Sequence, residues 1–142
     1  MTKRLCAVIM LAVLLMQSAA VFAKTVGEYI SDGNEAFHER NFDQAIYEYT
    51  KALDIDPNVD KAYDNRGAAY AQEGSLTRAV DDFTMAIANN PVDMQAYQNR
   101  KMAYFQLKDY DKAWADVFKI EQLGGSVDHD FYQLLKKASG KP

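Results

Sequence analysis

The stretch that decides the fold is DKAYDNRGAAYAQEGSLTRAVDDFTMAIANNP, residues 60–91. Its first half places Tyr63, Gly67 and Tyr70 at i, i+4 and i+7, the spacing of one face of an α-helix. Gly74 can take the left-handed conformation that ends this helix, and Ser75 can accept a hydrogen bond from the free amides that open the next one. The second half carries another apolar stripe, made of Leu76, Ala79, Val80, Phe83, Ala86 and Ile87. The stretch therefore predicts two amphipathic helices joined by a short turn.

The same pattern recurs once before this stretch and once after it, at a constant interval. The matched sets are Tyr63 with Tyr29 and Tyr97, Ala79 with Ala45 and Ala113, Phe83 with Tyr49 and Val117, and Ser75 with Asn41 and Asp109. Because Ser, Asn and Asp are all favoured at helix N-caps, three turns carry the same chemistry at the same interval. The repeat predicts three helix pairs, over residues 26–39 and 42–55, 60–73 and 76–89, and 94–107 and 110–123.

This pattern resembles the tetratricopeptide repeat family. The family's small residue between paired helices, its two alanines and its closing proline are met by Gly33 and Gly67, by Ala45 with Ala52 and Ala79 with Ala86, and by Pro57 and Pro91. The resemblance implies an all-α fold, a right-handed superhelical solenoid with repeats at residues 26–59, 60–93 and 94–127.

The third repeat departs from the family pattern at three positions, Lys101, Ile120 and Gly125, where the pattern asks for small, small and Pro. Glycine at the first of these positions lets two helices approach closely. We therefore expect Lys101 either to direct its stem outward or to hold the last helix pair further apart.

A further helix is predicted over about residues 127–139, after Gly124 and Gly125 end the preceding one. Its expected apolar face comprises Phe131, Leu134, Leu135 and Ala138. Open repeat stacks expose an apolar flank unless something covers it, so this helix is expected to act as the cap. Repeats and cap account for nearly all of residues 24–142, which predicts one domain.

Residues 1–23 have the features of a cleavable signal peptide. Lys3 and Arg4 precede an apolar run over residues 5–16, and Val21 and Ala23 supply the small residues that a signal peptidase reads. Cleavage after Ala23 predicts a periplasmic or secreted protein; an uncleaved N-terminal anchor is the alternative. Cys6, the only cysteine, lies at the start of the apolar run and not after it, so no lipid anchor is expected.

The charge of the chain disfavours two classes of partner. Without Lys3 and Arg4, 14 basic residues face 20 acidic ones, a net charge of −6 with histidine neutral. Proteins that track phosphates need the opposite sign, so nucleic acid is not an expected partner. Charge-driven binding to a membrane surface is disfavoured for the same reason.

No catalytic, metal or cofactor motif stands out. The two histidines, His38 and His129, are far apart in the repeat register, and neither has an evident nucleophile or orienting group beside it. Residues 54–60 alternate acids as a calcium loop does, but Val59 and Asn65 stand where that loop needs Gly and Glu. We therefore expect neither an enzyme nor a bound metal or cofactor.

The face of each first helix opposite its tyrosines has an unusual composition. At 100° per residue this face holds Gly27, Ile30, Ser31, Asn34, His38, Lys61, Asp64, Asn65, Ala68, Gln72, Gln95, Gln98, Asn99, Met102 and Gln106. Seven of these fifteen are Asn or Gln, whose carboxamides donate and accept hydrogen bonds at once and can bind the backbone of an extended peptide.

In the family that this chain resembles, these faces line a concave groove. The resemblance implies that the groove binds a segment of another protein. The predicted groove residues are Ile30, Asn34, Phe37, Lys61, Asn65, Gln72, Gln95, Gln98, Asn99, Met102 and Phe105. Phe37 and Phe105, with Ile30 and Met102, flank the carboxamides and could receive apolar side chains.

Two alternatives stay open and one is rejected. The stripe could be merely solvated, or the protein could be a self-associating scaffold that uses its tyrosines, Trp114 or the irregular third repeat. Some family members bind acidic chain termini through groove cations, and Asn34 and Asn65 match their two asparagines. However, Ile30, Gln95 and Asn99 stand where those members need Lys, Lys and Arg. That mode is rejected.

Overall fold

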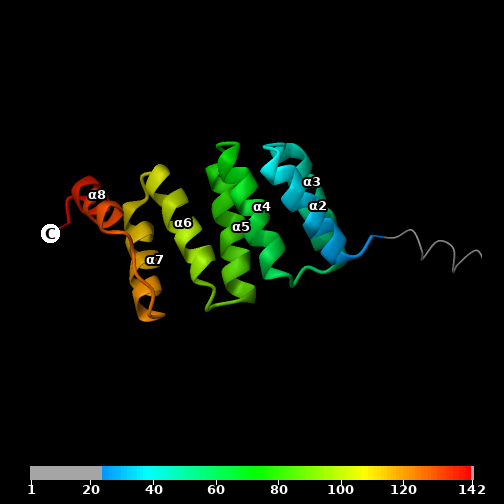
Figure 1. Cartoon of the computed structure of the whole chain (residues 1–142). Helices are drawn as coiled ribbons and strands as arrows, with labels where there is room; N and C mark the ends of the chain where they lie inside the picture. Colours follow the sequence, from blue (N-terminus) through cyan, green and yellow to red (C-terminus); the bar gives the residue numbers. More distant parts are fainter. Residues whose placement is uncertain (1–23, 142) are drawn as a thin grey trace, which may run out of the picture.

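The computed structural model describes residues 24–141, which form an all-α structure. Its helices are α2 (Val26–His38), α3 (Phe42–Ile55), α4 (Asp60–Gln72), α5 (Leu76–Asn89), α6 (Met94–Gln106), α7 (Tyr110–Gln122) and α8 (His129–Ser139). They follow one another in a row along the molecule (Figure 1). The expected all-α repeat fold is thus confirmed, whereas the predicted signal peptide lies outside the described residues. Among those residues, no helix has the length and apolar character that crossing a bilayer requires.

The turn inside each helix pair has one shared geometry. Gly74 has φ +83°, as expected for a left-handed helix end, and the residues one repeat away, Arg40 and Lys108, both have φ +62°. After each of them the backbone N–H of Asn41, Ser75 or Asp109 donates to a carbonyl in the last turn of the preceding helix, at 2.8–2.9 Å. This shared hydrogen bond holds two non-glycine residues in a conformation that they seldom adopt.

The predicted side-chain caps form at two of these three turns. Asn41 accepts from the amide of Gln44 at 3.3 Å, and Asp109 accepts from the amide of Lys112 at 3.4 Å. Ser75 makes no side-chain cap bond, so that prediction was wrong. The hydroxyl of serine lies one bond closer to the backbone than the oxygen of Asn or Asp, whose bonds here are already long. Thr25, whose hydroxyl is equally short, does cap α2, at 3.2 Å from Glu28 N, but its backbone is extended with ψ 164°, whereas Ser75 has ψ 58°. The short side chain together with this backbone conformation leaves Ser75 without a cap bond.

The helices of the first two repeats touch closely because glycine stands at their crossing. A Cβ at Gly33 would lie 2.5 Å from the ring of Tyr49, and a Cβ at Gly67 would lie 2.8 Å from the ring of Phe83. Both rings are almost fully buried. These contacts explain why the sequence keeps a small residue at the crossing.

Lys101 occupies the same crossing in the third repeat, and it is buried rather than directed outward, contrary to one of the two expectations. By repeat register it faces Val117, which is much smaller than Tyr49 or Phe83 and leaves room for the lysine stem. Its ammonium lies 3.8 Å from the centroid of the Phe131 ring, on α8. Burial lowers the pKa of Lys101, and the nearby Asp128 carboxylate opposes that shift.

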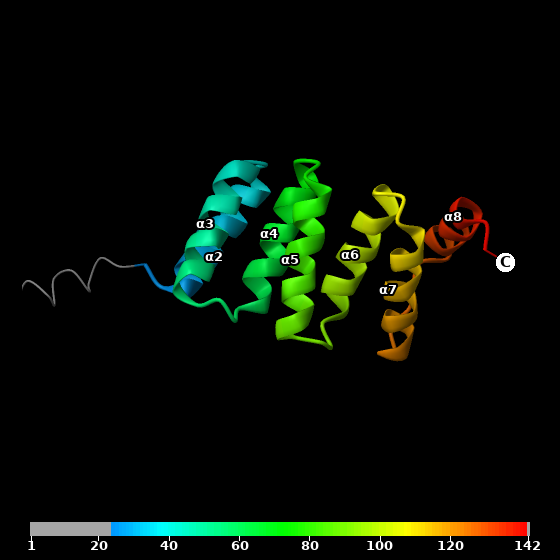
Figure 2. The ribbon, with the colours of Figure 1, turned by 180° about the vertical axis from the view of Figure 1, so that it is seen from behind.

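The stack has an inner and an outer layer. The first helices α2, α4 and α6 contact one another in sequence, whereas no comparable contact joins α3 to α5 or α5 to α7 within residues 24–141. Figure 2, which shows the molecule from behind, presents the same row of helix pairs with α3, α5 and α7 toward the viewer. Because α2, α4 and α6 lie closer to one another than α3, α5 and α7 do, the stack curves toward them, and they form its concave inner layer.

The last helix covers the end of the stack with a narrower face than expected. Phe131 and Leu135 are buried against Ala113, Trp114 and Val117 of α7. Leu134 is 51% exposed, and Ala138 is also exposed, so half of the predicted apolar face was wrong. Phe131 also meets Phe105 of α6, with ring centroids 5.4 Å apart, so two residues one turn apart make the buried contacts of α8 with both α6 and α7.

Trp114 is consequently part of the core and not a contact surface. It is 4% exposed, its ring lies edge to face with Tyr132, and its indole N–H donates to Ser139 Oγ at 3.0 Å. The hypothesis that Trp114 joins two copies of the chain is therefore wrong, since α8 of the same chain covers it.

A repeated ion pair that was not predicted from the sequence links successive repeats. Arg66 of α4 makes two hydrogen bonds to Asp82 of α5, at 2.7 and 2.9 Å, and a third to Thr50 of α3 in the preceding repeat, at 3.0 Å. One repeat later, Arg100 makes the same bonds, to Asp116 and Thr84. The same three residue types, Arg, Asp and Thr, recur at the repeat interval, and this recurrence was the sequence signal that could have predicted the ion pair. We call each Arg–Asp–Thr group an interrepeat lock.

Candidate functional site

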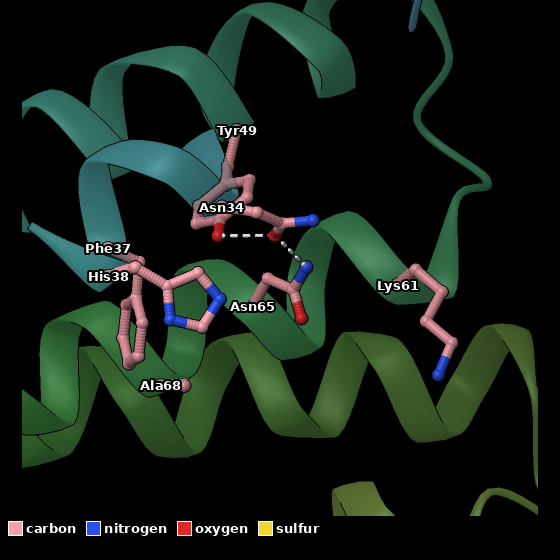
Figure 3. Close-up of a pocket in the computed structure, with 7 residues that line it drawn as sticks. All are labelled: Asn34, Phe37, His38, Tyr49, Lys61, Asn65 and Ala68. Atoms are coloured by element: carbon pink, nitrogen blue, oxygen red, sulfur yellow. Dashed lines mark hydrogen bonds between the residues drawn. The ribbon is translucent and has the colours of Figure 1, made fainter. Parts of the chain in front are cut away.

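Three side chains on the concave side form the start of a polar row. Asn34 of α2 lies between Tyr49 of α3 and Asn65 of α4 (Figure 3). Its Oδ1 accepts from the hydroxyl of Tyr49 at 2.8 Å and from Nδ2 of Asn65 at 2.9 Å. Burial raises the pKa of Tyr49 to about 12, which keeps the phenol protonated as a donor. The two asparagines are therefore held in a fixed orientation across adjacent repeats.

These bonds decide which amide atoms remain free to bond to another molecule. Asn34 uses its oxygen twice, so its Nδ2 remains a donor with no partner among the described residues. Asn65 uses its nitrogen, so its Oδ1 remains an acceptor with no partner in that same part of the chain. The two asparagines therefore offer one free donor and one free acceptor, the two kinds of group to which the backbone of an extended segment can bond.

The row changes partner at the next repeat. Nδ2 of Asn99 donates to Oδ1 of Asp64 at 3.0 Å, and Oδ1 of Asn99 accepts from Nε2 of Gln95 at 3.0 Å. In the second repeat the position that corresponds to Asn34 is Ala68, which offers no acceptor. Asn99 therefore bonds to Asp64, and the asparagine-to-asparagine bond of the first two repeats does not recur here.

Two hollows lie along the concave side, one repeat apart. The first has a volume of about 430 Å³ between α2 and α4, and its lining residues are Asn34, Phe37, His38, Tyr49, Lys61, Asn65 and Ala68 (Figure 3). The second has a volume of about 240 Å³, and its lining residues are Ala68, Ala71, Gln72, Phe83, Asn99, Met102, Ala103 and Gln106. Because their lining positions correspond in the repeat register, the hollows are two copies of one site.

The structure brings some of the predicted groove residues together and places others elsewhere. Asn34, Phe37, Lys61 and Asn65 share the first hollow, and Gln72, Asn99 and Met102 share the second. Gln95 bonds to Asn99 beside the second hollow, while Gln98, half-buried, lines neither. Whether these residues bind a partner stays a prediction.

Two predicted groove residues, Ile30 and Phe105, also pack against the core and line neither hollow. Ile30 packs on the cluster of Ala52, Leu53 and Ala62. Phe105 lies against Phe131 of α8, with ring centroids 5.4 Å apart. Both side chains are half-buried, so the core takes up part of the surface that an incoming apolar group was expected to contact.

The floor of the hollows was not predicted from the sequence. Tyr49 and Phe83 were assigned only to the core, although each also lines a hollow. The signal for Tyr49 was its hydroxyl, since its counterparts Phe83 and Val117 have none. Ala68 lines both hollows, and its small side chain leaves the space between them open.

The hollows differ in charge. Lys61 and His38 line the first, whereas the buried carboxylate of Asp64 lies beside Asn99 at the second. Burial raises the pKa of Asp64, and the hydrogen bond from Asn99 partly offsets that rise. No group of three or more His, Cys, Asp or Glu that could hold a metal ion occurs within residues 24–141.

Sequence comparisons point to one kind of repeat. The family model described as TPR repeat matches residues 33–74. Hsp70-Hsp90 organizing protein 1 of Arabidopsis thaliana is 54% identical over 98 residues, which cover 69% of this chain and 16% of that protein. The protein of the same name from Glycine max is 32% identical over 90 residues, 63% of this chain and 16% of that protein. The chain thus spans about one sixth of the length of these curated relatives.

Solved structures agree with this assignment. The first TPR of Spaghetti (RPAP3) bound to the HSP90 peptide SRMEEVD is 28% identical, with a TM-score of 0.74, over 82% of this chain and 91% of that one. The TPR2B domain of yeast Sti1 in complex with pHsp70 is 28% identical, with a TM-score of 0.71, over 82% of this chain and 98% of that one. Both are domains of the same helix-pair architecture.

Proposed function

Because this chain belongs to the tetratricopeptide repeat family, we propose that it is an exported interaction module that binds an extended segment of another protein along its concave side. Two of the similar structures are, by their descriptions, complexes with HSP90 and Hsp70 partners. Their architecture supports peptide binding as the general activity. The chemistry of the partner segment must be inferred from the groove residues of this chain.

The observation that carries the proposal is the paired asparagines. Asn34 and Asn65 line the first hollow, and Nδ2 of Asn34 and Oδ1 of Asn65 have no partner among the described residues. In an extended segment the N–H and the C=O of one residue point to the same side, so the backbone of the segment can bond to both asparagines. Tyr49 fixes Asn34 in place, which reduces the entropy lost on binding.

The ligand of the similar HSP90-bound domain does not transfer to this groove. Its peptide, SRMEEVD, carries acidic residues. In this chain Ile30, Gln95 and Asn99 occupy the three positions where family members that bind acidic termini carry cations. Only Lys61 supplies a fixed positive charge to the first hollow. The proposed partner segment is therefore not an acidic chain terminus.

Export is a part of the proposal that rests on sequence alone. Its support is the basic pair Lys3 and Arg4, the apolar run over residues 5–16 and the small residues before Lys24. Lys24 is also the first described residue, and its ammonium bonds to Asp32 and Glu48. Cleavage after Ala23 would leave these contacts intact. The proposed location is the periplasm or the extracellular space.

Site-specific crosslinking in the native organism tests the proposal. A benzophenone amino acid is placed at Met102, which is 41% exposed at the second hollow, or at Met85, which is 43% exposed on the outer layer. The two positions match in residue type and exposure. We expect a crosslinked partner from position 102 and none from position 85.

The pattern of crosslinks separates the proposal from its alternatives. The partner band from position 102 should weaken when Asn34 and Asn65 are both replaced by alanine. Crosslinks only to a second copy of the chain would favour the self-associating scaffold. A partner captured from position 85 alone would refute the groove, and absence of the protein from the exported fraction would refute export.

A further inference from the structure

Asp64 is a charged residue on the concave side that the proposed function leaves without a role. It lies on α4, one turn before Ala68, and is 6% exposed. Its Oδ1 accepts from Nδ2 of Asn99 on α6 at 3.0 Å. The carboxylate therefore lies between two neighbouring first helices, next to a residue that lines the second hollow.

One oxygen of this carboxylate is still available. Oδ2 of Asp64 has no hydrogen-bond partner among residues 24–141, and no Lys or Arg of that part forms an ion pair with it. Every fully buried polar side-chain atom there has a partner, so Oδ2 must reach the surface. A carboxylate that is otherwise withdrawn from water strongly favours a cationic partner.

The charges around Asp64 strengthen its negative field. Asp93, the N-cap of α6, and Asp60, in the first turn of α4, both act on its carboxyl, against the single positive charge of Lys61. Lys61 is exposed and is not within ion-pair distance of Asp64. Three carboxylates against one ammonium leave this part of the groove negative.

We propose that Asp64 determines which peptide segments bind, by accepting a hydrogen bond from a lysine or arginine side chain of the bound segment at the second hollow. This inference rests on the proposed function. The segment's backbone bonds to Asn34 and Asn65, and its basic side chain reaches Oδ2 of Asp64. Asp64 and Asn65 are consecutive residues of α4, bonded toward α6 and α2 respectively, so the basic side chain belongs to a residue near the one that bonds the asparagine pair. The groove thus selects a charge opposite to that of the acidic peptide in the similar HSP90-bound structure.

The isosteric variant Asp64→Asn isolates the charge. It keeps an oxygen that can accept from Asn99. Burial raises the pKa of Asp64, so the ionised carboxyl destabilises the folded state above the pKa of the unfolded chain. Asn removes that penalty, and we expect the variant to unfold at the same or a higher temperature at pH 7. A change in binding then reports specificity and not loss of the fold.

Selection from random peptides tests the proposal without a known partner. Residues 24–142 of the wild type and of Asp64→Asn are each probed with an array of random dodecapeptides with blocked termini. We expect Lys and Arg to be enriched among peptides bound by the wild type, and not among those bound by Asp64→Asn. For one selected basic peptide, Kd should rise roughly tenfold in the variant.

A third variant, Asn34→Ala with Asn65→Ala, separates this proposal from the proposed function. Peptides that need the asparagines but show no enrichment of basic residues would overturn the role of Asp64 and leave the groove intact. Enrichment of acidic residues, or equal enrichment in the wild type and Asp64→Asn, would also overturn it. If no selected peptide depends on the asparagines, both proposals fail.

Discussion

Gly67 shows how one residue sets the distance between two helices. A Cβ there would lie 2.8 Å from Phe83 and 3.2 Å from the carbonyl oxygen of Ala79. We expect Gly67→Ala to lower the free energy of unfolding by about 1 to 3 kcal/mol, because the buried ring and the backbone cannot both yield. Urea unfolding followed by circular dichroism measures the change.

Gly27 supplies the matched control. Its added Cβ would meet only Thr25, at 4.0 Å, and alanine is the better helix former. Gly27→Ala should therefore leave stability unchanged or raise it by up to about 1 kcal/mol. Equal destabilisation by both substitutions would show that the helix crossing is not the cause.

For single residues, the hydrogen-bond partners in the candidate site were harder to predict from the sequence than the packing of the core. The sequence placed Asn34, Asn65 and Asn99 on one face correctly, because that depends only on helical spacing. It could not show that Asn99 bonds to Asp64, since that choice depends on Ala68 of a neighbouring helix. The missing cap at Ser75 was also beyond the sequence, because it depends on the backbone angle at the cap: Thr25 has an equally short hydroxyl and does cap its helix.

Arg66 stabilises the arrangement of whole helices, because its hydrogen bonds join α4 to Asp82 of α5 and to Thr50 of α3 in the preceding repeat. Asp82 is 6% exposed. We expect Arg66→Ala to lower the free energy of unfolding by about 3 to 5 kcal/mol, since it leaves a buried carboxylate without its cation. Thermal and urea unfolding both report the loss.

Two controls show whether the loss comes from the stranded charge. Arg78→Ala removes an exposed arginine that only lies over the Tyr70 ring, and should change stability by less than about 0.5 kcal/mol. The apolar pair Arg66→Met with Asp82→Leu should recover most of the stability. A double variant as unstable as Arg66→Ala would mean that the hydrogen bond to Thr50 matters more.

Helix α8 offers a second test at this scale, in two adjacent leucines. Leu135 is fully buried beside Trp114, whereas Leu134 is 51% exposed. Leu135→Ala should destabilise the cap by about 2 to 5 kcal/mol, and Leu134→Ala should have almost no effect. Trp114 is the only tryptophan, so its fluorescence reports loosening of α8 directly. A larger effect at Leu134 would contradict this packing of the cap.

Helix positions were largely predictable from the sequence, and helix contacts were not. The repeat register and the caps at Asn41 and Asp109 located each of the six repeat helices to within about one residue at its ends. Periodicity also found α8, but it assigned Leu134 to the buried face. A period identifies which residues share a face; the width of the neighbouring helix decides how much of that face is covered.

For the whole molecule, the curved row of helix pairs means that each pair is stabilised only by its neighbours. The pair α4 and α5 is held on both sides, by α3 and α6, and by locks centred on Arg66 and Arg100. Helix α8 contacts chiefly α7, and α2 has no repeat on its outer side within the described residues. Stability should therefore fall from the centre of the stack toward both ends.

Hydrogen exchange measured by mass spectrometry on residues 24–142 tests this gradient. Amides of α4 and α5 should exchange most slowly, because opening them disrupts two interfaces, and those of α2 and α8 should exchange fastest. Arg100→Ala should accelerate exchange in α6, α7 and α8 more than in α2 and α3, since it cuts the link between the second and third repeats. Uniform exchange throughout, or equal acceleration of all helices, would show instead that the stack opens as a single cooperative unit.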